Sequence, residues 1–376
     1  MPITERPKII ADQEIPYLKG VLESVADITY LPSTDITKHR IREADALMIR
    51  TRTKSNKNLL EGTDVRFIAS ATSGIDHVDT TFCRSAGIEV RNAPGCNSSA
   101  VAQYIGSSLM NIFRAENRRP EQLTLGIIGV GHVGKKVSDL AQSLGMSVLL
   151  NDPPRQRIEG DKQFTPLVDL IKKSDIITLH VPFNRDGIDK TEHLVNEAFL
   201  RRMQPKGWLI NASRGEVTSS QALLKAPESI KLILDVWENE PHIDNQLLKR
   251  TRLGTPHIAG YSVNGKANAT MQSVRALSSF FGLGVENYVP KIPLPADDVI
   301  VPKGLNPMEK LSSAVLRTYD IGHDDKMLKN NPEAFEMFRK DYRCRWEFEN
   351  YTVALSASEK QLASWFNKIG FNLQNR

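Results

Sequence analysis

Three short runs, far apart in the chain, each contain one side chain suited to acid/base chemistry on an organic acid. The runs are residues 211–215, 235–241 and 255–260. Arg214 offers a planar fork of N–H donors that can hold a carboxylate. His257 can take or give a proton near neutral pH, and Glu240 can orient its imidazole. Taken singly these are ordinary surface turn residues, but in this order, behind a dinucleotide-binding sequence, they predict hydride transfer on a 2-hydroxy acid.

The dinucleotide-binding sequence is a glycine loop between a predicted strand and a predicted helix. Residues 123–129 read as a buried strand, and residues 135–144 as a helix. Gly129 would permit a tight turn, Gly131 would let the backbone approach a pyrophosphate, and Gly134 would allow the helix to pack closely on the strand. The context on both sides of the loop predicts a cofactor site of the Rossmann type.

The start of that helix and the end of the next strand complete the predicted cofactor site. Free backbone amides, including those of His132 and Val133, would face the phosphates. Asp152 follows the predicted strand 147–151 and would accept hydrogen bonds from the ribose hydroxyls. Its charge would repel a 2′-phosphate, which favours NAD over NADP. Two arginines close by weaken this preference: Arg155 and Arg157. A glycine turn in a protein that binds no dinucleotide is the alternative, and the combined context disfavours it.

Short apolar runs alternate with helical stretches along most of the chain, which predicts parallel sheets with right-handed crossovers. Early strands are expected at 8–11, 45–50, 66–71 and 88–92, with a helix at 14–24. Later strands are expected at 123–129, 147–151, 176–181, 207–211, 232–236 and 252–254. Ser98 or Ser99 would cap a helix over 100–114 that bridges two domains, and a helix over 267–281 would pack back onto the first region.

A proline-rich stretch over residues 288–295 separates this pattern from a more polar tail. We therefore predict a substrate-binding domain over 1–94 and 265–286, a dinucleotide-binding domain over 95–264, and a C-terminal domain over 287–376. The tail is small for an independent hydrophobic core, so we expect it to be stable only when packed against a partner. A dimerisation module is the first interpretation, and an extension packed on the same subunit is the alternative.

Composition sets the broad class of protein. The chain has 376 residues, 40% of them hydrophobic and 25% charged, with a formal net charge of +5. No basic arm or aromatic-rich basic face predicts nucleic-acid binding. The three cysteines are widely spaced, which argues against a disulfide framework and suits a reducing cytoplasm. We expect no metal site, no signal peptide and no membrane span, since no apolar run reaches the ~20 residues that a span requires.

Over about the first 285 residues the chain resembles the D-isomer-specific 2-hydroxyacid dehydrogenases. The matching stretches are residues 92–95 with Val101 and Ala102, the glycine loop with Asp152, and residues 211–215, 235–241 and 256–260. The resemblance implies an α/β fold with two doubly wound parallel-sheet domains. One would be a flavodoxin-like substrate domain and the other a Rossmann NAD domain, followed by a small α+β dimerisation domain.

The resemblance also implies roles for single residues. Arg214 would bind the substrate carboxylate, Glu240 would support the histidine, and His257 would be the general acid/base. Asp235 would bind the nicotinamide carboxamide. Further contacts to NAD would come from Val181, Ala212, Ser213, Arg214 and Gly260.

Within that family the chain resembles a subgroup that oxidises 4-phospho-D-erythronate with NAD in pyridoxal 5′-phosphate biosynthesis. Residues 71–79, the double proline after Asp152, Tyr261 and the homodimer-forming C-terminal segment carry this likeness. Thr51, Thr72 and Tyr261 are the substrate contacts that we expect. Arg50 and Arg52, alternating at the end of a predicted strand, are candidates for holding the phosphate, and surface arginines are an equally good interpretation.

Two other functions stay open. One is a related dehydrogenase of the phosphoglycerate or glycerate type. The other is an NAD-sensing interaction protein, as some members of the fold family are transcriptional co-repressors. The complete set of Arg214, Glu240 and His257 favours an enzyme.

Overall fold

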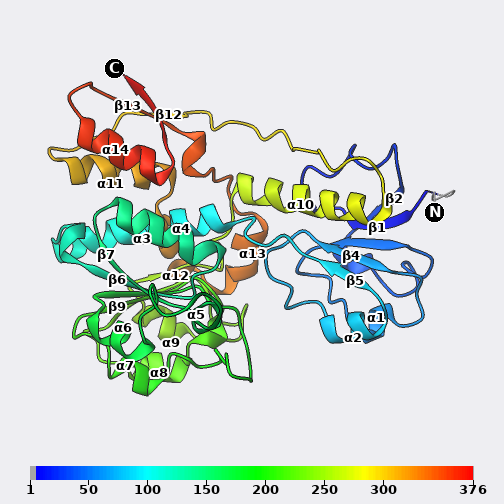
Figure 1. Ribbon diagram of the computed structural model, residues 1–376, viewed down its shortest axis with the longest axis horizontal. Helices are drawn as coiled ribbons and strands as arrows, with labels where there is room; N and C mark the ends of the chain where they lie inside the picture. Colours follow the sequence, from blue (N-terminus) through cyan, green and yellow to red (C-terminus); the bar gives the residue numbers. More distant parts are fainter. Residues whose placement is uncertain (1–5, 376) are drawn as a thin grey trace. The chain divides into compact units, whose positions relative to one another are not determined.

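The computed structural model describes residues 6–375 and forms two compact units (Figure 1). The first unit comprises residues 6–97 together with Ser262–Pro293, and the second comprises Ser98–Tyr261 together with residues 294–375. Residues 1–5 lie outside the described part. They belong to the start of the predicted substrate-binding domain and to the N-terminal stretch in which we expect no signal peptide. Across residues 6–375, no helix has both the length and the apolar character needed to cross a membrane.

A five-stranded parallel sheet forms the centre of the first unit, in the order β2-β1-β3-β4-β5. Its strands are β1 (Lys8–Asp12), β2 (Asp27–Leu31), β3 (Ala46–Ile49), β4 (Phe67–Ser70) and β5 (Glu89–Arg91). This is the flavodoxin-like order that the resemblance implies. The helix α10 (Val263–Phe281) covers one face of this sheet, and the shorter helices α1 (Lys57–Leu60) and α2 (Thr80–Ser85) lie by the other.

The helix predicted over residues 14–24 is wrong, since this segment forms a series of turns. Pro16 cannot donate a backbone hydrogen bond, and Tyr17 and Gly20 have φ angles of 62° and 85°, which an α-helix does not allow. Leu18 and Leu22 are nevertheless fully buried against the sheet. Their spacing reflects burial and not helical structure. The edge strand β2 was not predicted.

A six-stranded parallel sheet forms the centre of the second unit, in the order β11-β10-β9-β8-β6-β7. Its strands are β6 (Thr124–Ile128), β7 (Ser147–Asn151), β8 (Ile176–Leu179), β9 (Trp208–Asn211), β10 (Lys231–Leu234) and β11 (Leu253–Gly254). All six predicted strands are confirmed with small shifts at their ends. The chain winds outward from β6 in both directions, and a dinucleotide binds at such a reversal, beyond the carboxyl ends of the strands.

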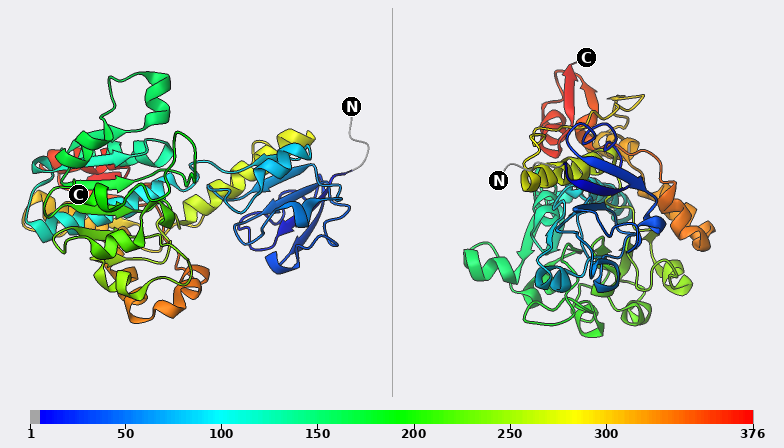
Figure 2. Two further views of the ribbon diagram at one scale, coloured as in Figure 1. Left: turned by 90° about the horizontal axis from the view of Figure 1, so that it is seen from below. Right: turned by 90° about the vertical axis from the view of Figure 1, so that its right-hand side faces the viewer.

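Helices cover both faces of this sheet (Figures 1 and 2). One face carries α3 (Ser98–Glu116) and α4 (His132–Ser143). The other carries α6 (Leu167–Lys173), α7 (Glu197–Leu200), α8 (Ser220–Lys225) and α9 (Asn245–Arg250), while α5 (Pro153–Glu159) follows β7. The predicted capping of α3 by Ser98 or Ser99 is wrong, because both residues lie inside its first turn. The Ser99 hydroxyl instead accepts a hydrogen bond from Lys136 at 2.6 Å.

The C-terminal segment, residues 294–375, packs on the rest of the second unit. It contains α11 (Pro307–Thr318), α12 (Ile321–Asn330), α13 (Phe335–Lys340), α14 (Lys360–Ile369) and a parallel sheet of β12 (Val299–Ile300), β13 (Thr352–Leu355) and β14 (Asn372–Asn375). Helix α11 contacts α3, and α14 contacts α4. Its apolar side chains share one core with these helices, so the segment has a partner for its apolar face within its own chain. The three-domain division and dimerisation through the tail stay predictions.

Candidate active site

The glycine loop follows β6 and leads into α4. A Cβ atom on Gly134 would lie 2.0 Å from the carbonyl oxygen of Gly129, and one on Gly129 would lie 2.5 Å from the carbonyl oxygen of His180. Both glycines are therefore needed by the packing of the protein itself. At Gly131 a Cβ would meet nothing within 4 Å, so only a molecule approaching from outside would require glycine there. His132 and Val133 occupy the first turn of α4, where backbone amides are free for phosphates.

Asp152 stands directly after β7, where the fingerprint predicts it. Its Oδ2 accepts the backbone hydrogen of Val130 at 2.7 Å, and its Oδ1 accepts that of Arg155 at 3.1 Å, as the N-cap of α5. The carboxylate thus ties the glycine loop to the next turn, and each oxygen keeps a lone pair for a ribose hydroxyl. This arrangement fits NAD.

The two arginines near Asp152 are both engaged in ion pairs. Arg155 donates to both carboxylate oxygens of Glu159, at 2.6 and 2.7 Å, and Arg157 meets Asp189 at 2.5 Å. Neither guanidinium offers an uncompensated charge for a 2′-phosphate. The local electrostatics agree with NAD as the cofactor.

At the end of β8, His180 and Val181 border the glycine loop. Nε2 of His180 lies 3.0 Å from the Thr178 hydroxyl, and burial lowers the pKa of this histidine to about 3. Because its imidazole stays neutral near pH 7, His180 cannot take up and release a proton there, which fits a structural role. The Cγ1 atom of Val181 would be 2.8 Å from a Cβ on Gly129, so its side chain lies against the loop.

The acid/base pair predicted from the sequence is formed. Nδ1 of His257 lies 2.7 Å from Oε2 of Glu240, and a proton on Nδ1 leaves Nε2 as the basic nitrogen. Oε1 of Glu240 accepts the backbone hydrogen of Trp237 at 2.9 Å. Burial works to raise the pKa of Glu240, but the contacts with His257 and Trp237 outweigh it and the pKa is lowered. Glu240 is therefore a carboxylate that can stabilise an imidazolium.

His257 sits in a left-handed backbone conformation, with φ of 54°. Such a conformation costs on the order of 1 kcal/mol or more and needs support from its surroundings. Its backbone N–H donates to the carbonyl oxygen of Asp235 at 2.7 Å. The support therefore comes from the loop after β10.

Asp235 supplies the rest of that support through its side chain, which is 1% exposed. The carboxylate accepts hydrogen bonds from the Thr255 hydroxyl at 2.7 Å and from the amides of Ile258 at 2.8 Å and Ala259 at 2.9 Å. Burial raises its pKa against the opposing effect of His257 and these donors. Asp235 is thus a positioning residue for the loop that carries His257, a role that the sequence did not indicate. Its contact with the nicotinamide stays a prediction.

The loop with Arg214 is shaped by Asn211, the last residue of β9. Oδ1 of Asn211 accepts from the backbone and the hydroxyl of Ser213 at 3.0 and 2.8 Å, while its Nδ2 donates to the carbonyl of Arg214 at 2.9 Å. A Cβ on Gly215 would lie 2.1 Å from the carbonyl carbon and oxygen of Trp237. This close approach brings the loop of Ala212, Ser213 and Arg214 against the loop of Glu240.

The predicted site residues of the second unit therefore gather at one edge of its sheet. Gly129, His180, Asn211, Asp235 and Thr255 each stand at or just beyond the carboxyl end of a different strand. Parallel strands bring their carboxyl ends to one edge, which is where ligands bind in such sheets. Gly260 and Tyr261 follow directly in the turn after the His257 loop, with the Tyr261 amide donating to Ile258 at 2.8 Å.

The predicted substrate residues Thr51 and Thr72 belong to the first unit. Thr51 follows β3 and Thr72 follows β4. These two strands pair in parallel, with Ile49 opposite Ser70, so both threonines lie at the carboxyl edge of that sheet. Thr51 is exposed, whereas the Thr72 hydroxyl donates to the carbonyl oxygen of Gly74 at 2.7 Å.

The strand alternation proposed for Arg50 and Arg52 is wrong. Strand β3 ends at Ile49, and residues 50–53 form a turn closed by the Thr53 amide on the Arg50 carbonyl at 3.2 Å. Arg50 donates to the carbonyl of Glu14 at 3.1 Å. Two residues in a turn do not share a face by period-two alternation, so that argument for a phosphate site fails.

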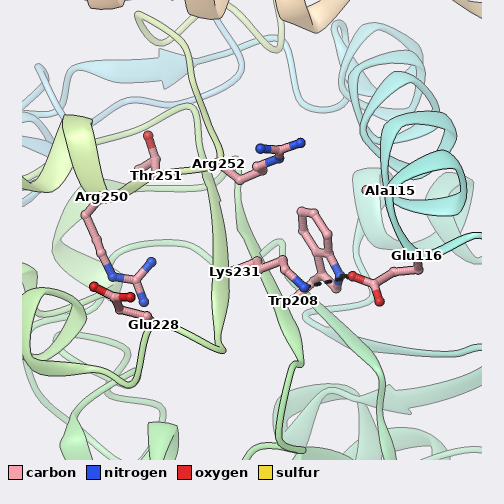
Figure 3. A pocket seen from close by; sticks show the side chains of 8 residues that line it. All are labelled: Ala115, Glu116, Trp208, Glu228, Lys231, Arg250, Thr251 and Arg252. Atoms are coloured by element: carbon pink, nitrogen blue, oxygen red, sulfur yellow. Dashed lines mark hydrogen bonds and ion pairs between the residues drawn. The ribbon is translucent and has the colours of Figure 1, made fainter.

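A hollow of about 410 Å³ opens at the opposite edge of the second sheet (Figure 3). Trp208 and Lys231 begin β9 and β10, and both donate to Glu116, at 3.0 and 2.9 Å. Its lining is completed by Ala115, Glu228, Arg250, Thr251 and Arg252. Because it lies at the amino ends of the strands, it is separate from the edge that carries His257.

No described group of three or more His, Cys, Asp or Glu side chains within residues 6–375 is arranged to hold a metal ion. The three cysteines are free thiols, with Cys83 and Cys96 buried and Cys344 exposed.

Comparisons with known proteins agree with this geometry. Residues 103–259 match the family model of the D-isomer specific 2-hydroxyacid dehydrogenase, NAD binding domain, and residues 293–370 match a domain of unknown function, DUF3410. Among solved structures, a cofactor (NAD+) bound 3-phosphoglycerate dehydrogenase of Entamoeba histolytica has a TM-score of 0.64 at 24% identity, covering 76% of this chain and 99% of that one. A D-lactate dehydrogenase of Aquifex aeolicus complexed with NAD and lactic acid has a TM-score of 0.61 at 24% identity, covering 73% and 95%. At this identity the two structures support the fold alone.

Curated relatives are more similar and cover almost the whole chain. An erythronate-4-phosphate dehydrogenase of Bacteroides thetaiotaomicron is 47% identical over 350 residues, which is 92% of this chain and 99% of the relative. The enzyme of the same name from Escherichia coli is 38% identical over 375 residues, or 97% and 98%. The resemblance drawn from the sequence is confirmed: the chain belongs to the erythronate-4-phosphate dehydrogenase family, within the D-isomer specific 2-hydroxyacid dehydrogenases.

Proposed function

We propose that this protein oxidises 4-phospho-D-erythronate to (R)-3-hydroxy-2-oxo-4-phosphooxybutanoate with NAD, as a step of pyridoxal 5′-phosphate biosynthesis. The observation that carries the proposal is the His257–Glu240 pair at 2.7 Å, in a chain that matches relatives of that name from end to end. An acid/base pair of this kind is what alcohol oxidation by hydride transfer requires.

Three residues of the second unit would have separate roles in this reaction. Arg214 holds the substrate carboxylate with its guanidinium fork and stabilises negative charge on the neighbouring oxygen. Nε2 of His257 takes the proton of the C2 hydroxyl, and the carboxylate of Glu240 stabilises the imidazolium that results. The glycine loop and Asp152 would hold NAD, which would supply the hydride acceptor for C2. In the reverse direction the imidazolium of His257 returns its proton to the ketone oxygen.

Further contacts belong to the same proposal. Val181, Ala212, Ser213, Asp235 and Gly260 would contact the cofactor. The substrate would be contacted by Thr51, Thr72 and Tyr261. We also propose that the protein acts in the cytoplasm as a homodimer joined through the C-terminal segment.

Turnover of alternative substrates tests the activity. Purified protein with NAD is offered 4-phospho-D-erythronate, unphosphorylated D-erythronate, 3-phospho-D-glycerate and D-glycerate, with NADH fluorescence as the readout. Single-turnover conditions and an added 2-oxo acid acceptor allow for NADH that stays bound. We expect kcat/KM for 4-phospho-D-erythronate to exceed the others by at least ~100-fold, the scale of a desolvated, charge-assisted phosphate contact. Equal rates on the unphosphorylated acids contradict the proposed substrate.

A further inference from the structure

The C-terminal segment reaches the loop that carries His257 through Arg345. This side chain is 2% exposed, and its Nη2 donates to the carbonyl oxygen of Ala259 at 2.5 Å and lies 3.4 Å from that of Ile258. Its guanidinium carbon stands 4.3 Å from the centre of the Tyr319 ring, also in the C-terminal segment. Arg345 therefore connects the core of that segment to the carbonyl groups of the two residues that directly follow His257.

The same loop is held from its other side. Asp235 accepts from the amides of Ile258 and Ala259, and the Thr255 hydroxyl bridges Asp235 to the phenol of Tyr104 at 2.7 and 2.9 Å. With Asp235 on the amides and Arg345 on the carbonyls, the backbone of both Ile258 and Ala259 contacts buried charged side chains. Such a loop has little freedom to move, which keeps a reacting group in place.

A second arginine of the segment lies near Tyr261, which follows the loop of His257. Arg339, on α13, has a side chain that is 19% exposed, and its guanidinium carbon stands 6.0 Å from the centre of the Tyr261 ring. Tyr342 meets the same tyrosine ring edge-on, with centroids 5.8 Å apart. Two side chains of the C-terminal segment thus hold Tyr261, four residues after His257.

Arg339 forms an ion pair with a carboxylate of its own helix. Its Nη1 pairs with Glu336 at 2.8 Å, while its buried Nε has no hydrogen-bond partner among residues 6–375. Its positive charge acts on Glu240 and helps to lower the pKa of that carboxyl. Asp235 interacts electrostatically with His257, and Arg339 with Glu240, while Glu336 and Tyr261 interact with Arg339.

We propose that the C-terminal segment positions the acid/base pair, with Arg345 holding the loop of His257 and Arg339 holding Tyr261 and placing positive charge beside Glu240. This gives the domain of unknown function a role within its own subunit, separate from dimerisation. The inference rests on the proposed function for its kinetic readouts. Its spectroscopic readout does not depend on any substrate.

Arg339 is tested by comparing Arg339→Met with Arg339→Lys. The positive charge of Arg339 disfavours the imidazolium of His257, so its loss moves the acidic limb of kcat/KM to higher pH. We expect a shift of about 0.5 to 1 pH unit for the Met variant and about a third of that or less for the Lys variant. NMR titration of the labelled His257 imidazole in substrate-free protein must show the same shift.

The two readouts separate the possible failures. If the His257 titration is the same in Arg339→Met and the wild type, Arg339 does not tune the pair and the inference fails. If the titration shifts but neither the wild type nor any variant oxidises 4-phospho-D-erythronate, the proposed function fails and the inference stands. A uniform loss of kcat at every pH, with no shift of the limb, marks a merely structural residue and also overturns this part.

Arg345 is tested by Arg345→Lys and Arg345→Met, with Arg317→Met as the matched control. Arg317 is an exposed arginine of the same segment that pairs with Asp297 at 3.1 Å. We expect kcat to fall by roughly 10- to 100-fold in both Arg345 variants, as for a misplaced reacting group, with the Kd for NADH within about 2-fold of wild type. Arg345→Lys, which keeps a buried cation, decides the matter if Arg345→Met does not fold. Wild-type kcat in a folded Arg345 variant overturns the proposal.

Discussion

Asp235 accepts the backbone hydrogen of Ile258 at 2.8 Å, so the residue directly after β10 is bonded to the residue that directly follows His257. This contact explains how His257 keeps a left-handed backbone conformation. It also means that two short loops form one unit around a buried carboxylate. The predictions below depend on this unit and on the glycines that allow the loops to meet.

Asp235→Asn tests the buried carboxylate. An amide group has one acceptor oxygen, and its NH₂ would face the N–H of Ile258 or Ala259, leaving donors unsatisfied. We expect a loss of about 1–3 kcal/mol in the free energy of unfolding and a fall in kcat of at least ~10-fold. Urea unfolding and steady-state kinetics measure the two effects. Asp297→Asn, at an exposed ion pair, is the control, and equal behaviour of the two variants contradicts the positioning role.

Gly131→Ala and Gly134→Ala are expected to change different properties, NAD affinity in the first and stability in the second. A methyl group at Gly134 would lie 2.0 Å from the Gly129 carbonyl oxygen, so this variant should lose about 1–3 kcal/mol of stability. At Gly131 a methyl group has open space, so stability should stay within ~0.5 kcal/mol while NAD affinity falls at least ~10-fold. Thermal unfolding and NADH fluorescence titration check both. Unchanged NAD affinity in Gly131→Ala would place the pyrophosphate elsewhere.

His257→Ala removes the proposed acid/base. We expect kcat to fall by about 10²- to 10⁴-fold, because proton transfer would have to pass through water, while the Kd for NADH changes by less than about 3-fold. Single-turnover hydride transfer and fluorescence titration measure these quantities. Near wild-type activity would make the assignment of His257 wrong.

Glu240→Gln tests the effect of pH. In the folded protein the pKa of Glu240 is lowered, although burial opposes this, because His257 stabilises the carboxylate. The charge thus contributes stability above the ordinary carboxyl pKa of about 4.3, and this contribution is lost as pH falls through the folded value. We expect the wild type to be more stable than Glu240→Gln near pH 7, with the difference shrinking below about pH 4.

The same substitution moves the activity profile in a defined direction. Without the carboxylate, the imidazolium of His257 is less stable, so the acidic limb of kcat/KM moves to lower pH. This is opposite to the shift expected for Arg339→Met. Two variants that shift the limb in the same direction would contradict this account of the charges around His257.

Much of the site could be predicted from the sequence because its signals are local. A buried strand, a glycine turn and a helix within about twenty residues encode the cofactor loop, and the carboxyl ends of parallel strands converge by geometry alone. The pairing of Glu240 with His257 followed from residue chemistry and family order. Local signals also misled, for example where the spacing of Leu18 and Leu22 resembled a helix although the positive φ angles of Tyr17 and Gly20 exclude one.

The tertiary structure alone decided what holds these residues still. Asp235, Thr255 and Tyr104 form one buried network across 151 residues of sequence, and Arg345 reaches Ala259 from 86 residues away. No spacing rule connects such positions, because they meet only when α3, the sheet edge and the C-terminal segment pack in one core. The sequence by itself therefore determined which groups we assign to the chemistry, and long-range packing decided which groups position them.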